Sequence, residues 1–73
     1  MTLDELKPGS KGRMADLTAT GALGQRLMDL GFCPGAEIAV VRNAPLEDPL
    51  KIVLDGAQVT LRHAEAKHIV MEA

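Results

Sequence analysis

Aromatic side chains are almost absent from this 73-residue chain, which has no Trp, no Tyr and a single Phe, Phe32. Small barrels that bind single-stranded nucleic acid stack bases on several aromatic faces, so that class is disfavoured. Grouped cations are missing too, because the 8 Lys and Arg residues are scattered and are outnumbered by 10 Asp and Glu residues. Clustered cations supply most of the affinity for phosphates, so we expect no nucleic-acid partner.

Long apolar runs and paired cysteines are also missing. The longest uninterrupted aliphatic run covers only residues 38–41, which is too short to span a bilayer or to form the core of a secretion signal. The lone Cys33 cannot form an intramolecular disulfide and is typical of a reducing compartment. We therefore expect a cytoplasmic protein that does not insert into a membrane directly.

The length predicts one domain, residues 1–73. A domain of this size buries only about 60% of the surface that its unfolded chain exposes, so nearly every apolar residue is needed to close the core. The apolar share of 47% and the charged share of 25% are ordinary for a chain that folds. We expect a globular domain without a deep substrate cleft, and hence not an enzyme.

Residues 21–30 have the spacing of an α-helix. Leu23, Leu27 and Leu30 fall at i, i+4 and i+7, a stripe that we expect to face the core. Gly31 then suits a left-handed helix end, in which Phe32 packs on Leu27.

The pair Asp55-Gly56 between two extended runs predicts a two-residue β-hairpin turn, because both central residues of that turn need positive φ. The apolar face of this hairpin pairs Leu54 with Ala57, Ile52 with Val59 and Leu50 with Leu61, and the opposite face pairs Lys51 with Thr60 and Val53 with Gln58. A slip by one residue would expose the apolar set to water, which favours this register.

Further strands are predicted over residues 11–17, 37–42 and 68–72, and short helical turns over residues 2–5 and 62–67. Pro45 and Pro49 force a loop between two of the strands. The fold class is therefore mainly β: a small, strongly bent β-barrel of about five strands with one inserted α-helix and short helical turns.

The chain resembles the ferrous iron transport protein A family, FeoA, through four phrases. They are Leu-x-x-Leu-x-Pro-Gly at 3–9, RLMDLGFCPG at 26–35, APLEDPL at 44–50, and the Asp-Gly hairpin that runs into LRHAEA at 61–66. The hydrophobic residues Ile69 and Val70 near the end fit as well.

The resemblance implies an SH3-like barrel. It also implies a small accessory or adaptor protein of the bacterial ferrous iron uptake system, bound at the inner face of the membrane to a permease with a cytoplasmic GTPase domain. The same fold occurs in repressors of the diphtheria-toxin-repressor type, so a metal-responsive regulatory module that acts on a repressor or another soluble partner is the alternative. Fold alone does not decide between them.

The iron connection makes metal ligands the next question, and the candidates are Cys33, His63, His68 and the acidic residues. A structural metal site needs closely spaced Cys or His pairs, whereas His63 and His68 are five residues apart and share neither a helix face nor a strand face. Glu65 and His68 have the Glu-x-x-His spacing of di-iron sites, but those need several long helices. Association with Fe²⁺ is thus not supported by ligand spacing, and we expect no metal ligands and no intrinsic cofactor.

The helix carries the first expected partner surface. Met28 lies about 140° from the centre of the Leu stripe, beside Gly21, Gly24 and Gln25. Small residues beside a methionine form a low, adaptable apolar surface on which a protein can sit closely. The alternative is that Met28 folds under a neighbouring loop.

The second expected partner surface is the loop between the two prolines. Leu46 at its tip, flanked by acidic residues, is either an anchor for a partner or a plug for the open end of the barrel. Association of the chain with copies of itself stays open.

Overall fold

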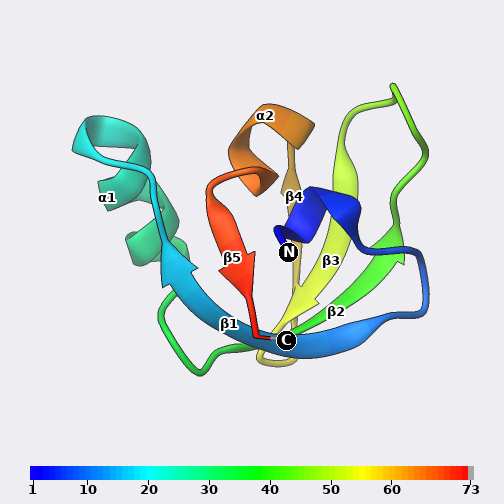
Figure 1. The fold of residues 1–73 in the computed structure, drawn as a ribbon, viewed down its shortest axis with the longest axis horizontal. Helices are drawn as coiled ribbons and strands as arrows, with labels where there is room; N and C mark the ends of the chain where they lie inside the picture. The colour runs from blue at the N-terminus through cyan, green and yellow to red at the C-terminus, as the bar shows by residue number, and fades with distance from the viewer. Residues whose placement is uncertain (73) are drawn as a thin grey trace.

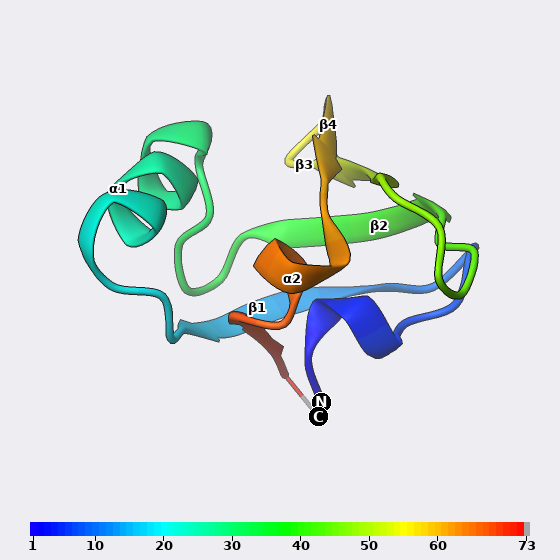
Figure 2. The ribbon, with the colours of Figure 1, turned by 90° about the horizontal axis from the view of Figure 1, so that it is seen from above.

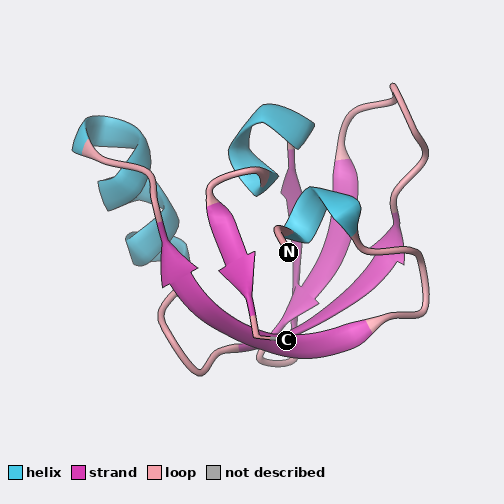
Figure 3. Cartoon of the chain, viewed as in Figure 1, coloured by secondary structure: helices cyan, strands magenta, loops and turns pink. Residues whose placement is uncertain are grey.

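The computed structural model describes residues 1–72, and its helices and strands follow the predicted order (Figure 1). The elements are a 3-10 turn η1 (Leu3–Glu5), β1 (Lys11–Leu17), α1 (Gly21–Leu30), β2 (Glu37–Arg42), β3 (Leu50–Leu54), β4 (Ala57–Leu61), α2 (His63–Ala66) and β5 (Ile69–Met71). The three helical segments lie around the strands (Figure 3). The mainly β class is confirmed.

The five strands form one antiparallel sheet in the order β4-β3-β2-β1-β5. β1 belongs to both halves of this sheet, because its first residues pair with β2 while residues 14–17 pair with β5 across an irregularity after Met14. Such irregularities bend a strand and increase its twist. The long curve of β1 in Figure 1 therefore brings β5 back toward the other strands and forms the bent barrel.

The hairpin has the predicted register at all five pairs, from Leu54 with Ala57 to Leu50 with Leu61. Both turn residues have positive φ, 47° at Asp55 and 90° at Gly56. The inward residues of β3 are buried, which is the reason for the register.

The core is aliphatic apart from Phe32 and the two methionines at positions 14 and 71. Its members are Leu3, Met14, Leu27, Phe32, Ala36, Ile38, Val40, Leu50, Ile52, Leu54, Leu61, Ala66, Ile69 and Met71. α2 lies over the interior of the barrel between β4 and β5 (Figure 2), and its Ala66 is fully buried. Within residues 1–72 no polar or charged residue is buried.

The end of α1 has the predicted left-handed cap. Gly31 has a φ of 109° and its N–H donates to the Met28 carbonyl at 2.9 Å, while the Phe32 N–H donates to the Leu27 carbonyl at 3.1 Å. These are the two hydrogen bonds of the Schellman motif. Because Leu27 and Phe32 are both fully buried, the helix end is tied to the core.

The predicted Leu stripe is wrong at Leu30, which is 45% exposed, although Leu27 is buried and Leu23 half-buried. The reason is that Gly24 is buried against Ala19. The approach is so close that a Cβ at position 24 would lie 2.5 Å from the Ala19 carbonyl oxygen. At 100° per residue Gly24 and Leu30 lie about 60° to either side of Leu27. The contact face of α1 is therefore rotated toward Gly24, and Leu30 is turned outward.

We expect Gly24→Ala to lower the free energy of unfolding by about 1–3 kcal/mol, even though Ala favours helix, because its Cβ meets backbone that cannot move alone. Gly12→Ala is the control, since a Cβ there meets only the flexible Met71 Cε at 3.4 Å, and we expect a loss below about 1 kcal/mol. Urea denaturation measures both. Equal stability of Gly24→Ala and wild type would contradict the close approach.

Candidate functional site

The outward side of α1 presents Met28, which is 52% exposed. The interpretation that Met28 folds under a loop is therefore wrong. Gly21 and Gln25 beside it are exposed as well, as predicted. The prediction that Gly24 belongs to this surface is wrong. Gly24 is buried against Ala19, so it contributes to the packing of the helix and is not accessible to a partner.

The exposed side of α1 has a polar centre and two apolar borders. In the centre, the Gln25 Nε2 donates to the Asp29 Oδ1 at 2.9 Å. Met28 and Leu30 are two residues apart, which places them about 160° apart around the helix axis. Leu30 was assigned to the core by sequence, so its part in this surface was missed.

Leu46 at the tip of the loop between β2 and β3 is fully exposed, with a relative accessibility of 103%. The interpretation as a plug for the barrel is wrong. Leu46 also has a φ of 63°, in the left-handed region that residues with a Cβ avoid. The loop thus holds a leucine side chain in solvent at a conformational cost.

The base of this loop is held by a hydrogen-bond network around His63. The His63 Nδ1 lies 2.6 Å from the Asp48 Oδ1, and the Nε2 lies 2.9 Å from the Asn43 Oδ1. The Asn43 Nδ2 donates to the carbonyls of Asp4 at 2.9 Å and Leu6 at 2.6 Å, which fixes the direction of its amide. Both ring nitrogens of His63 therefore face acceptors, and both ends of the loop are fastened to α2 and η1.

The same histidine stabilises the Asp48 carboxylate. The main-chain N–H of His63 donates to the Asp48 Oδ1 at 2.8 Å, and this bond, followed by the one from the ring, lowers the pKa of Asp48 below its ordinary value of 3.8. A carboxylate that accepts hydrogen bonds is favoured over its protonated form. This hydrogen-bonded pair was missed by sequence because its members lie 15 residues apart.

The possible metal ligands are not brought together. The His63 ring is engaged by Asp48 and Asn43, and the His68 Nδ1 lies 3.2 Å from the Thr18 Oγ1. Cys33 is exposed. Across residues 1–72 there is no group of three His, Cys, Asp or Glu side chains placed to hold a metal ion.

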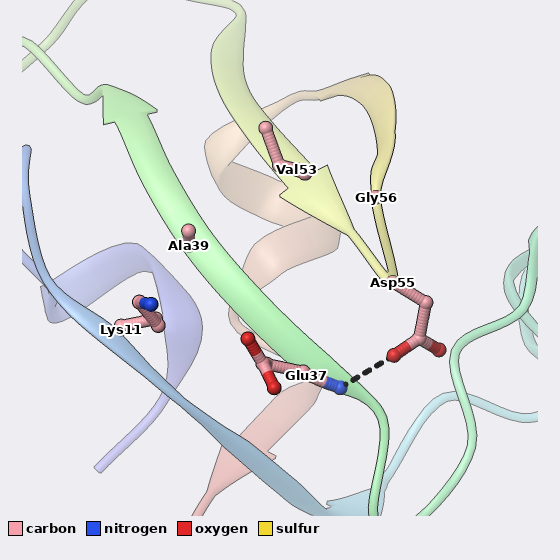
Figure 4. A pocket seen from close by; sticks show the side chains of 6 residues that line it. All are labelled: Lys11, Glu37, Ala39, Val53, Asp55 and Gly56. Atoms are coloured by element: carbon pink, nitrogen blue, oxygen red, sulfur yellow. Dashed lines mark hydrogen bonds between the residues drawn. The ribbon is translucent and has the colours of Figure 1, made fainter.

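A shallow groove of about 490 Å³ lies on the outer face of the sheet (Figure 4). Ala39 and Val53 are neighbours on adjacent strands and form its floor, with Lys11, Glu37 and Asp55 around them. The Asp55 Oδ1 accepts the Glu37 main-chain N–H at 2.9 Å, so the turn is fastened to β2. The groove thus has one cationic and two anionic side chains around an apolar floor.

In Figure 1 α1 and the loop that carries Leu46 lie at opposite ends of the horizontal axis, with α2 between them, and Figure 2 shows the same arrangement from above. No helix among residues 1–72 is long and apolar enough to cross a membrane.

The sequence model of a protein family, described as the FeoA domain, matches residues 1–73. The chain belongs to the FeoA family. A putative Fe(2+) transport protein A of Campylobacter jejuni is 35% identical to it over 69 residues, which are 94% of this chain and 93% of the relative. The sequence resemblance to FeoA is thereby confirmed.

A longer relative joins this domain to a transporter. The Fe(2+) transport protein A/Fe(2+) transporter FeoB fusion protein of Porphyromonas gingivalis is 33% identical over 72 residues. Those residues are 99% of this chain but only 8% of the fusion protein. In that relative, an FeoA domain and an FeoB transporter are parts of one polypeptide.

Solved structures confirm the SH3-like fold. FeoA from Stenotrophomonas maltophilia, an SH3 domain protein crystallised with zinc, has a TM-score of 0.88 at 32% identity, over 99% of this chain and 89% of that one. A manganese-dependent transcriptional repressor has a TM-score of 0.87 at 19% identity, over 100% of this chain and 41% of that one. The repressor likeness shows the shared fold alone.

We expect Asp48→Asn to lower stability above pH 3.8, the ordinary pKa of the group, and to matter less in acid. Because the pKa of Asp48 is lower in the folded than in the unfolded protein, its carboxylate stabilises the fold at pH values where it is ionised in both. This contribution is lost as pH falls through the pKa of the folded state. Urea unfolding from pH 5 down to about 2 should show the difference from wild type shrinking. Glu47→Gln removes a charge from the same loop and is the control; a difference that persists unchanged in acid would contradict the pairing.

Proposed function

We propose that this FeoA-family chain is a small cytoplasmic accessory protein of a bacterial ferrous iron uptake system. It binds the cytoplasmic part of the iron transporter and modulates the assembly or activity of that transporter without being an enzyme. The observation that carries the proposal is the fusion relative, in which FeoA and FeoB are one chain. Fusion keeps two domains at a high effective concentration, which is useful when they act together.

The exposed apolar residues support α1 and the Leu46 loop as the contact surface. Single exposed apolar side chains are common, so Met28 by itself says little. Leu46 says more, because left-handed backbone costs about 1–2 kcal/mol for a residue with a Cβ, and its side chain buries nothing in return. Strain combined with exposure is more often found at a binding site than in a merely structural loop.

The proposed mode of action is binding alone. A protein that only binds can shift a transporter between two states only by binding one of them more tightly. The His63 network supports this role because a loop that is fastened at both ends loses little entropy when a partner covers Leu46. Iron is the cargo of the transporter in this proposal and is not held by the barrel.

The first test is Met28→Glu, with capture of the purified, detergent-solubilised iron transporter by the tagged chain. We expect capture to weaken by about tenfold or more, because a charge is buried at the contact. Thermal stability should change by less than about 0.5 kcal/mol, since Met28 is exposed.

Val41→Glu is the matched control for Met28→Glu, because Val41 is 49% exposed and lies near the end of β2 away from α1. Equal capture by wild type and Met28→Glu would rule out the α1 surface. Capture of a soluble repressor but never of the transporter would replace the proposal by the regulatory alternative.

The second test is Leu46→Ser, which removes the apolar tip of the loop. We expect weaker transporter capture, by about fivefold or more, at unchanged stability, because no core contact is lost. Leu46→Met keeps an apolar side chain of similar size and should retain binding. Capture and urea denaturation are measured on both variants, and loss of stability in Leu46→Ser would return Leu46 to a structural role.

A further inference from the structure

The two edges of the sheet differ in whether other backbone covers them. The β5 edge is covered by the start of the chain, since Thr2 bridges Val70 and the Met71 N–H donates to the Met1 carbonyl at 2.8 Å. Within the described part of the chain, residues 1–72, no strand pairs with the outer edge of β4. Its sequence, AQVTL, also lacks the charges, prolines and bulges with which proteins commonly blunt an open edge.

The free hydrogen-bonding groups of this edge belong to two residues. Leu54 and Ala57 flank a two-residue turn and form a hydrogen-bonded pair, so Val59 and Leu61 also direct their backbone groups toward β3. Gln58 and Thr60, between them, direct N–H and C=O away from the sheet. Among residues 1–72 no hydrogen bond outside the ladder engages these groups.

A groove of about 460 Å³ adjoins this edge at its Thr60 end. Arg26 of α1 lines it from one side and Thr60 and Arg62 from the other. In Figure 2 α1 lies to the side of β4, and the groove that Arg26 and Thr60 line lies between them.

Two cationic and two anionic side chains line the groove: Arg26, Asp48, Arg62 and Glu65. Its Glu65 carboxylate is occupied by the Arg26 guanidinium and by the Arg62 main-chain N–H at 2.9 Å. Asp48 is occupied by His63. The Arg62 guanidinium is exposed and, within residues 1–72, forms no ion pair, although its charge contributes to the lowered pKa of Asp48.

We infer that the β4 edge binds an extended segment of a partner protein by strand addition, with an acidic side chain of that segment beside Arg62. Backbone hydrogen bonds to Gln58 and Thr60 supply register, and the arginine selects the charge. This surface is additional to the outward face of α1 and to Leu46. Its test contains no transporter, so either idea can fail while the other stands.

The probe is a capped heptapeptide of alternating Thr and Val with one central Glu, added to the ¹⁵N-labelled full chain. We expect the amide signals of Gln58 and Thr60 to shift. Their exchange with solvent should slow by about tenfold at a peptide concentration about ten times the Kd. A peptide with Gln in place of Glu should bind about threefold more weakly, and Arg62→Gln should remove that preference.

Two controls keep the test decisive. Thr60→Pro removes an outward N–H without removing a ladder bond, and should abolish binding, while Thr60→Val should bind normally. If Thr60→Pro fails to fold, the wild-type chain is titrated with a peptide that is N-methylated at alternate residues, which cannot pair along the edge. Shifts confined to α1 or to the Leu46 loop, or equal binding of the N-methylated peptide, would overturn the inference.

Discussion

The pairing of β1 with two strands at once is the constraint on which the rest of the structure depends. Its first half pairs with β2 of the β2–β3–β4 layer and its second half pairs with β5, so one bent strand wraps the sheet around an aliphatic core. The Thr18 N–H, just past β1, donates to the His68 carbonyl at 2.8 Å, and α1 begins three residues later. The same arrangement leaves the outer edge of β4, among residues 1–72, without a paired strand.

The interior and the exposed surfaces have opposite chemistry. Phe32 and the aliphatic side chains fill the interior, and the Phe32 ring, the one aromatic ring of the chain, anchors the end of α1. What remains for recognition is a small set of exposed apolar residues on α1 and at the loop tip. The His63 network then restricts the loop without burying it, since its hydrogen bonds act at Asn43 and Asp48, on either side of Leu46.

Local chemistry explains which parts of the fold could be predicted from sequence. The Asp55-Gly56 turn and the Gly31 cap each have a backbone requirement that two or three residues express, so the hairpin register and the end of α1 were predicted residue by residue. The exposure of Leu30 and the burial of Gly24 could not be predicted, because a helical wheel considers only the residues of the helix and not the backbone that packs against it. Contact with the Ala19 carbonyl, which a wheel does not contain, sets the rotation of α1. The Asn43, Asp48 and His63 network escaped for a similar reason, since only the folded chain brings these residues together.

The division between a closed β5 edge and an open β4 edge bears on how so small a domain can act on a large partner. A 73-residue domain has no spare core from which to build a cleft, so its binding energy has to come from surfaces that folding leaves unused. An exposed helix face supplies apolar contact, and an open strand edge supplies directional hydrogen bonds. If the proposed α1 and β4 surfaces bind the same partner, they contact different parts of it. Two modest contacts that are made together discriminate between partner conformations better than either alone, since a conformation that separates the two contact points loses one of them.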